Sequence, residues 1–526
     1  MPITVNLTGL QNAQGTEITT NHRDIEFLEI LVNEHLKSDK LKFLKEADAY
    51  YRNKNVVINE KVNFIYGENG AKEVATNFTN TKNAHAFMKK LVNQKASYLC
   101  GKPFSYKTEQ AKLSEVLPQF FNRKFFLQIL QIAKASIKGG LAWLQVYYTM
   151  DGKLAFKRIP TEELYPLWRD GEHTELEAML RVYEILEYGT GGVKTVVRKI
   201  EYYDYTGVYY FMLTKDGKFV YDPEREGNGF YSPNFFVKTK KKIIKVDEET
   251  GEKVEVETDE EVDEGRLWDK LPFICFKFND EELGVLTWVK DLIDNYDMID
   301  SKTSDKMQDS PDNLLIIEGY RGTEKEAFAK NINLFRSVFV DIGGKVSSLQ
   351  KTIDINAITA HLTRLRKDIY EFGGGVDGQI ETNFPASGVA LKMRFSDLDL
   401  DAKLMATHFN SAMEQLLWFI CRDTEARGAD ALDETEVDIT FNMDMTINET
   451  EVINNINVSA RLLSTKTQLD MHPYVSDVEA EFEAKKKEQA AIMPYGSIES
   501  GTQPAGNKTI EDEEGAVASG EEGTEE

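Results

Sequence analysis

Three carboxylates in one run, Asp397, Asp399 and Asp401, have the D-x-D-x-D spacing with which a loop can bind calcium. Such a loop also needs glycine at its sixth position and glutamate at its twelfth, but Ala402 and His408 stand there. The run also falls inside a helical pattern, where such acidic residues usually face solvent. The sequence therefore predicts a solvated acidic face rather than a metal site.

The other patterns that could support catalysis are incomplete. The seven histidines show no H-x-x-x-H or H-x-x-E-H spacing, which disfavours a histidine metal site. Ser387 and Lys392 do not have the S-x-x-K spacing of a serine nucleophile beside a lysine. The glycines at 373–375 lack the G-x-x-x-x-G-K-[ST] pattern that cradles phosphates, and residues 67–70 are better explained as a turn. We therefore expect no enzymatic activity, no cofactor and no bound metal.

The composition limits the class of protein further. The 526 residues include 63 Lys or Arg and 88 Asp or Glu, which gives a net charge of −25. This charge excludes a protein that coats DNA by neutralising its phosphates. No run of about 18 apolar residues predicts a membrane-spanning helix. The N-terminal residues MPITVNLTGLQNAQG have no basic and apolar regions of a secretory signal. Cys100, Cys275 and Cys421 lie far apart, which indicates reduced, buried thiols in a cytosolic protein.

The first half of the chain alternates between helical and strand patterns. Helical spacing is predicted over 24–52, where Ser38-Asp39 caps the second of two helices, and over 83–100 and 109–138. After Gly140 the period changes to two, and the strands of an antiparallel meander are expected at 141–148, 153–159, 179–186, 195–205 and 207–214. Residues 238–265 begin basic and end acidic, and most simply form an exposed hairpin.

Two long helices flank a small module in the second half. The first is predicted over 282–309 and the second over 356–372, around a strand at 314–320, a helix at 323–335 and a strand at 337–343. The apolar residues of the second helix are spaced 4-3-4-3, and they are Ile358, Leu362, Leu365, Ile369 and Phe372. This spacing favours packing against a partner helix, although an ordinary core helix also fits.

A glycine-rich segment follows the second helix. Residues 373–387 have no apolar period and are expected to form a mobile loop. A third long helix begins near Ser387 and reaches about Arg427, and 436–445 alternates like a strand. Further helices are predicted over 448–490, and 491–526 has the composition of a disordered acidic tail.

The order and spacing of these segments resemble the portal proteins of tailed bacteriophages, in particular those of siphophages of Gram-positive hosts. The resemblance covers roughly residues 18–490. The strings that carry it are SYLCGKPFSY (97–106), SIKGGLAWLQVYYTMDGKLAFKRIPTEELYPLW (136–168), VKDLIDNYDMIDSKTSDKMQDSPDNLLIIEGY (289–320), LTRLRKDIYEFGG (362–374) and SGVALKMRF (387–395).

The resemblance implies a helix-rich α+β fold of the portal type. Its parts would be a flexible N-terminal arm (1–21), a wing (22–281, with the excursion 238–265), stem helices (282–309 and 356–372), a clip between them (310–355), a tunnel loop (373–387), a long helix with a wing return strand (388–447), a helical crown (448–490) and an acidic tail (491–526). The clip would be built on Leu315, Ile317, Val338 and Val340.

The resemblance also implies a function. Twelve copies would form a ring at one capsid vertex of the virion, assembled in the host cytoplasm, through which double-stranded DNA enters during packaging and leaves during ejection. Partners would be the terminase large subunit, the head–tail adaptor, and the major capsid and scaffold proteins, with no membrane. The channel residues would be Gly373, Gly374, Gly375, Asp377, Gln379 and Asn383. Two alternatives stay open: a non-portal structural or scaffold component of a phage particle, and an enzyme such as a nuclease.

Overall fold

A computed structural model describes most of the chain. The described residues are 25–66, 71–74, 78–149, 151–188, 194–205, 207–214, 217–223, 231–232, 235–246, 253–266, 268–309, 314–318, 342–349, 354–379, 393–443, 449–472, 474–475 and 478–492. The chain divides into two compact units, Met1–Thr446 and Ile447–Glu526.

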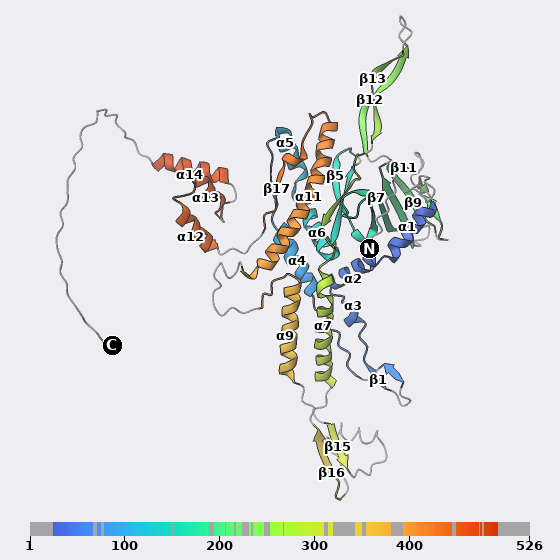
Figure 1. Ribbon diagram of the computed structural model, residues 1–526, viewed down its shortest axis with the longest axis vertical. Coiled ribbons are helices and arrows are strands. Elements are labelled where there is room, and N and C mark those ends of the chain that lie inside the picture. The colour runs from blue at the N-terminus through green and yellow to red at the C-terminus, as the bar shows by residue number, and fades with distance from the viewer. Residues whose placement is uncertain are drawn as a thin grey trace, which may run out of the picture. The chain divides into compact units, whose positions relative to one another are not determined.

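A six-stranded antiparallel sheet packs against helix α1 (Ile25–Lys37) in the first unit (Figure 1). Leu28 and Leu31 of the helix are buried against Leu180 and Ile200 of the sheet. The apolar face of the helix, with a period of 3.6 residues, therefore shares one core with the apolar face of the strands, with a period of two. The strand order is β10-β9-β8-β7-β6, with β11 on β9, which confirms the predicted meander for 179–186, 195–205 and 207–214. The two strands predicted before them, at 141–148 and 153–159, do not belong to this sheet. The strands are β6 (Leu164–Trp168), β7 (Leu176–Tyr188), β8 (Lys194–Asp204), β9 (Gly207–Leu213), β10 (Phe219–Tyr221) and β11 (Tyr231–Ser232).

A second, three-stranded sheet separates two cores. Its order is β14-β4-β5, with β4 (Leu141–Tyr148) between β5 (Leu154–Ile159) and β14 (Phe273–Lys277). Ala142 and Leu144 face the large helical core, whereas Trp143 packs on the other side with Trp168. The predicted hairpin between β4 and β5 is confirmed, and its Gly152 has the φ of +68° that favours glycine.

The large core joins helices that lie far apart in the sequence. It buries Leu91, Ile132, Ile293, Ile369 and Phe409 together with residues of β4 and β14. The helices are α2 (Asp39–Tyr51), α4 (Phe87–Cys100), α5 (Ala111–Phe120), α6 (Arg123–Gly139), α7 (Leu286–Asp309), α9 (Ile355–Phe372) and α11 (Ser396–Ala426).

Helix boundaries follow local capping. Ser38 caps α2 as predicted, because its hydroxyl accepts a hydrogen bond from the Leu41 N–H at 3.2 Å. The helical pattern predicted over 109–138 is confirmed, but it forms two helices. The first ends at Phe120, and Asn122 starts α6 by accepting from the N–H groups of Lys124 and Phe125. Shorter helical segments are α3 (Val56–Asn59), η1 (Thr161–Glu163) and η3 (Glu434–Glu436).

Four further strand pairs complete the first unit. They are β1 (Phe64–Tyr66) with β2 (Lys72–Val74), β3 (Ser105–Lys107) with β17 (Asp438–Thr440), β12 (Phe235–Val246) with β13 (Lys253–Arg266), and β15 (Leu314–Glu318) with β16 (Lys345–Leu349). The β12–β13 pair confirms the predicted charged hairpin, and its register places Lys238 opposite Asp263 and Lys240 opposite Glu261. The return strand is shorter than predicted, although Val437 and Phe441 on either side are buried.

The strand predicted at 337–343 is wrong over its described end. Residues 342 and 343 lie in a turn, where Gly343 has a φ of +93°, and the partner of β15 is β16. The second unit contains helices, as predicted: α12 (Glu449–Ser459), α13 (Thr465–Asp470) and α14 (Val478–Ile492).

The three cysteines are free, with Cys421 buried and Cys100 and Cys275 half-buried. Burial raises the pKa of Cys100 and of Cys421 to about 12, so both thiols stay protonated at neutral pH. Among the described helices, none has the length and apolar character needed to cross a membrane.

Candidate functional site: the paired long helices and the base of the glycine-rich loop

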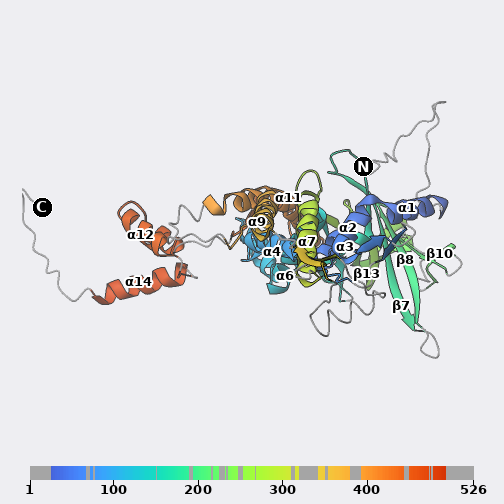
Figure 2. The ribbon, with the colours of Figure 1, turned by 90° about the horizontal axis from the view of Figure 1, so that it is seen from below.

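Helices α7 and α9, predicted as the stem, lie side by side (Figures 1 and 2). The apolar seam of α9 is buried at Leu365 and Ile369, and only half-buried at Ile358 and Leu362. Phe372 is 61% exposed and is not covered by α7 within the chain. One chain therefore supplies a partner for the middle of this seam only.

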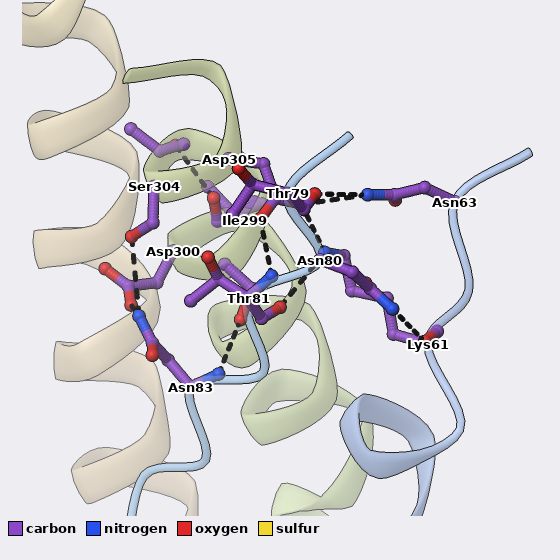
Figure 3. A network of polar contacts seen from close by, with 12 residues as sticks. Lys61, Asn63, Thr79, Asn80, Thr81, Asn83, Ile299, Asp300, Ser304 and Asp305 are labelled. Carbon is purple, nitrogen blue, oxygen red and sulfur yellow. Dashed lines mark hydrogen bonds and ion pairs between the residues drawn. The ribbon is translucent and has the colours of Figure 1, made fainter. Parts of the chain in front are cut away.

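A polar stripe runs along α7 on the side that bonds to residues between 55 and 85, and Figure 3 shows its end around Asp305. It consists of Asp297, Ser301 and Asp305, spaced as neighbours on one face of a helix, and all three are buried. Asp297 accepts from the Asn55 side-chain amide at 2.5 Å and from the His85 N–H at 3.0 Å. These bonds fasten an irregular segment to the helix through its backbone and side chains.

Asp305 is the centre of the network drawn in Figure 3. Its carboxylate accepts from the Thr81 N–H at 2.6 Å and forms an ion pair with Lys61, which is itself buried. Burial opposes ionisation of Asp305, but the hydrogen bonds from Lys61 and Thr81 outweigh it and lower its pKa to about 2. Asp305 is therefore ionised at any physiological pH.

The glycines that follow α9 are packed against α4. Gly374 has a φ of +57°, and a Cβ there would lie 2.4 Å from Asp401 Oδ2. A Cβ at Gly375 would lie 2.3 Å from a methyl carbon of Leu91, and one at Gly373 would lie 2.7 Å from the other. Glycine is needed at these positions because the backbone approaches α4 closely.

Two adjacent residues of α4 bind this backbone. Lys95 is buried, donates to the Gly374 carbonyl at 2.9 Å and forms an ion pair with Asp401. Gln94 donates to the Val376 carbonyl at 2.8 Å and accepts from the Val376 N–H at 3.2 Å. Burial lowers the pKa of Lys95, while the charge of Asp401 opposes that shift.

A second ion pair lies one step further along the chain. Arg366 of α9 donates to both oxygens of Asp377, at 2.6 and 2.8 Å, and Arg394 donates to the Asp377 carbonyl at 2.7 Å. The hydrogen bonds from Arg366 hold the pKa of Asp377 below its usual value, against the effect of burial. We call these residues the loop clamp: Gln94, Lys95, Arg366, Asp377, Arg394 and Asp401. It joins residues on both sides of 380–392.

Residues 373–377, predicted as the start of a mobile loop, pack closely against the rest of the chain. All three glycines lie close to α4, and Asp377 is buried in an ion pair with Arg366. Gln379 is exposed, and Asn383 lies outside the described residues. Within the predicted solvated acidic face only Asp397 is exposed.

The other two carboxylates of that face contact α4 or a neighbouring turn. Asp399 accepts from the Tyr98 hydroxyl at 2.9 Å and pairs with Lys403 at 2.6 Å, and Asp401 belongs to the loop clamp. Over the described ranges, no group of three or more His, Cys, Asp or Glu side chains could hold a metal ion.

Two of the four predicted clip residues lie in the part of the chain that the structure describes. Leu315 and Ile317 lie in β15, in register with Ser348 and Val346 of β16. Val338 and Val340 lie outside the described residues.

Sequence reasoning missed Lys95, Arg366 and the polar stripe of α7. A signal for Lys95 existed, because it lies four residues from both Leu91 and Leu99 on the apolar face of its helix. A lysine on a buried face requires a partner. No comparable signal marks Asp305, whose partners come from an irregular segment more than 200 residues earlier in the chain.

The family model of the phage portal proteins described as SPP1 Gp6-like matches residues 33–495. The chain is 25% identical over 462 residues to the portal protein of Bacillus phage SPP1, covering 87% of this chain and 85% of that relative. It is 26% identical over 454 residues to the portal protein of Clostridium phage phiCD119, covering 82% and 90%.

The chain belongs to the SPP1 Gp6-like family of phage portal proteins. Its function is therefore that of a phage portal protein, and its helix-rich α+β fold is the portal fold predicted from the sequence. The family is structural rather than enzymatic and forms oligomeric rings in phage particles, which indicates a place in the virion capsid.

The structure also resembles a chain in the neck of an empty gene transfer agent particle, with a TM-score of 0.41 and 10% identity over 74% of this chain and 90% of that chain.

Proposed function

We propose that twelve copies of the chain form a ring at one capsid vertex and that double-stranded DNA passes through it without sequence specificity. The loop clamp is the observation that carries this proposal. The buried Asp377 on one side of 380–392 pairs with Arg366, and its carbonyl accepts from Arg394 on the other side. Breaking an ion pair with a buried partner is costly, so these contacts would keep both ends of a DNA-facing loop in place.

The charges of the chain support a channel that does not bind DNA tightly. The net charge of −25 disfavours close phosphate contacts, which would slow the passage of DNA. The glycines of the loop are occupied against α4, so we assign the DNA-facing role to Gln379 and Asn383. Both are uncharged, and Gln379 is exposed. DNA would enter during packaging and leave during ejection.

The remaining assignments extend the family resemblance. The clip at 310–355 would bind the terminase large subunit and afterwards the head–tail adaptor. The first unit would contact the major capsid and scaffold proteins during assembly in the host cytoplasm. The chain itself would catalyse no reaction and need no cofactor, because the terminase supplies ATP hydrolysis.

A deletion tests the role of the loop. Removal of residues 380–386 should leave ring formation intact and should abolish or strongly reduce the DNase-protected DNA recovered from an in vitro packaging reaction. Removal of 520–526 from the acidic tail is the matched control and should change neither result. Normal packaging by the loop deletion would refute the assignment of 373–387 to the channel.

A further inference from the structure

A groove of about 1200 Å³ lies in the first unit, away from the loop clamp. Its walls are one face of α1, including Ile30 and Lys37, the strand β6, and residues 281–291. Its floor includes Leu141 and Trp143 of β4. The groove is therefore built from segments that are distant in sequence and meet around an apolar floor.

The groove has the characteristics of a binding site for an extended apolar segment. Ile30 and Leu283 are 57% and 39% exposed on its walls. The indole Nε1 of Trp143 has no hydrogen-bond partner among the described residues, although the side chain is buried. Pro166 in β6 has no N–H to offer an added strand, so affinity would come from side chains more than from backbone pairing.

The N-terminal sequence matches this site. Residues 3–8 read I-T-V-N-L-T, so that Ile3, Val5 and Leu7 would share one face of an extended chain and polar residues the other. The chain has no charged side chain before Glu17. The groove walls carry charges of both signs, among them Glu34, Lys37, Lys290 and Asp291, and so favour an uncharged occupant over a charged one.

The connection between the segment and the groove is long enough. The groove-lining residues of α1 begin at Ile30, and α1 is about 20 Å long at about 1.5 Å per residue. Residues 11–24 can span about 46 Å when extended, so they can return along α1 to its last turn. A tethered segment has an effective concentration of the order of millimolar, which makes weak apolar contacts sufficient.

We propose that residues 3–10 bind in this groove of their own chain, with Ile3, Val5 and Leu7 against the floor. The inference does not depend on ring formation, because every wall of the groove comes from one chain. It assigns the N-terminal arm a role in covering the apolar junction between α1, β6 and the start of α7.

Hydrogen exchange of the full-length protein tests the proposal. The variant Ile3→Ser/Val5→Ser/Leu7→Ser should speed exchange in the walls, residues 30–37 and 164–168, by about tenfold or more. The control Thr4→Ser/Asn6→Ser/Thr8→Ser alters the opposite face of the segment and should leave exchange unchanged. Equal exchange in wild type and the Ile3, Val5 and Leu7 variant would overturn the proposal.

Disulfide trapping identifies the chain that supplies the segment. Under mild oxidation the double variant Leu7→Cys/Leu283→Cys should form a bond within one chain. A mixed assembly that carries Leu7→Cys and Leu283→Cys on different chains should give no covalent dimer. A covalent dimer would overturn the proposal in favour of a neighbouring copy's arm. Electron microscopy of the same samples separates this result from the portal function, which would stand if rings form without the trapped bond.

Discussion

Lys95 is the residue on which the base of the glycine-rich loop depends most directly. It is 3% exposed, and its ammonium group is shared between the Gly374 carbonyl and Asp401. A buried charge is stable only while its partners remain, so the contacts across α4, the loop and α11 are mutually dependent. The residue thus links three elements through one side chain.

Replacement of Lys95 by methionine should separate these elements. We expect Lys95→Met to lower the free energy of unfolding by about 2 kcal/mol, less than for a fully buried pair because the Asp401 side chain keeps 38% of its exposure. Urea unfolding measures this change, and packaging assays measure the loss of loop position. Lys89→Met, on the exposed face of the same helix, is the control. Equal stability of the two variants would show that the clamp does not hold the loop.

Asp305 makes stability depend on pH in a defined direction. Its pKa in the folded chain, about 2, is below the usual value of 3.8. The stability it contributes is therefore complete above its unfolded pKa and is lost as the pH falls through the folded pKa.

The variant Asp305→Asn should reveal this contribution. At pH 7 it should lower the free energy of unfolding by about 3 kcal/mol, because it leaves the buried Lys61 without its ion pair. The difference from wild type should shrink as the pH falls from about 4 to 2. Asp269→Asn alters an exposed aspartate and serves as the control. A difference that stays constant over this range would contradict the assigned pKa.

The sequence predicted the contacts of individual residues less well than it predicted the fold. The glycines at 373–375 were identified, but glycine-rich composition alone does not distinguish a free loop from a tightly packed one. The distinction depends on Leu91, Gln94 and Lys95, which lie about 280 residues earlier. Phe372 continues the apolar spacing of its helix, yet it is exposed because α7 does not cover it.

The turn after α9 holds the end of this helix against α4 and α11. Gly374 combines a positive φ with a close approach to Asp401 and Lys95, whereas a Cβ at Gly378 would have no atom within 4 Å. The two glycines lie in one segment but have different requirements. This contrast provides a matched pair of variants.

Gly374→Ala should destabilise the chain by about 1–3 kcal/mol, because the new methyl group meets Asp401 in a backbone conformation that favours glycine. Gly378→Ala should have little effect. Thermal unfolding of both variants checks the prediction. A comparable loss of stability in both would show that close packing at 374 is not the cause.

The stem seam gives a second contrast. Ile369 is fully buried, so Ile369→Ala should lower the free energy of unfolding by about 2–5 kcal/mol. Phe372 is exposed in one chain, so Phe372→Ala should leave the unfolding of the subunit unchanged. If this end of the seam packs against a neighbouring subunit, Phe372→Ala should lower the denaturant concentration at which rings dissociate. Rings as resistant as wild type would place Phe372 outside the subunit interface.

The sequence correctly predicted the turns and helix caps that depend on a few neighbouring residues. The Asp-Gly turn at 151–152 and the cap at Ser38 are encoded within a few residues, and both are confirmed. The break at Phe121–Asn122 interrupts an apolar period that continues on both sides, so periodicity alone did not reveal it. The strand β16, which pairs with β15, was not predicted, and the segment predicted as a strand at 337–343 ends in a turn at 342–343.

For the whole molecule, family membership and the physical properties of the chain agree. The chain carries a net charge of −25 and contains two adjacent long helices with an incompletely covered seam. It anchors a loop beside them with ion pairs in which one partner is buried. An acidic chain is suited to guiding DNA without retaining it. A ring would cover the exposed end of the seam by contact between neighbouring subunits.

Negative-stain electron microscopy of the purified chain, with native mass spectrometry of the same sample, tests whether the protein forms a portal ring. We expect rings with a central hole and a mass corresponding to twelve subunits, or thirteen where assembly outside a capsid alters the number. A monomer or dimer at every salt concentration would contradict it.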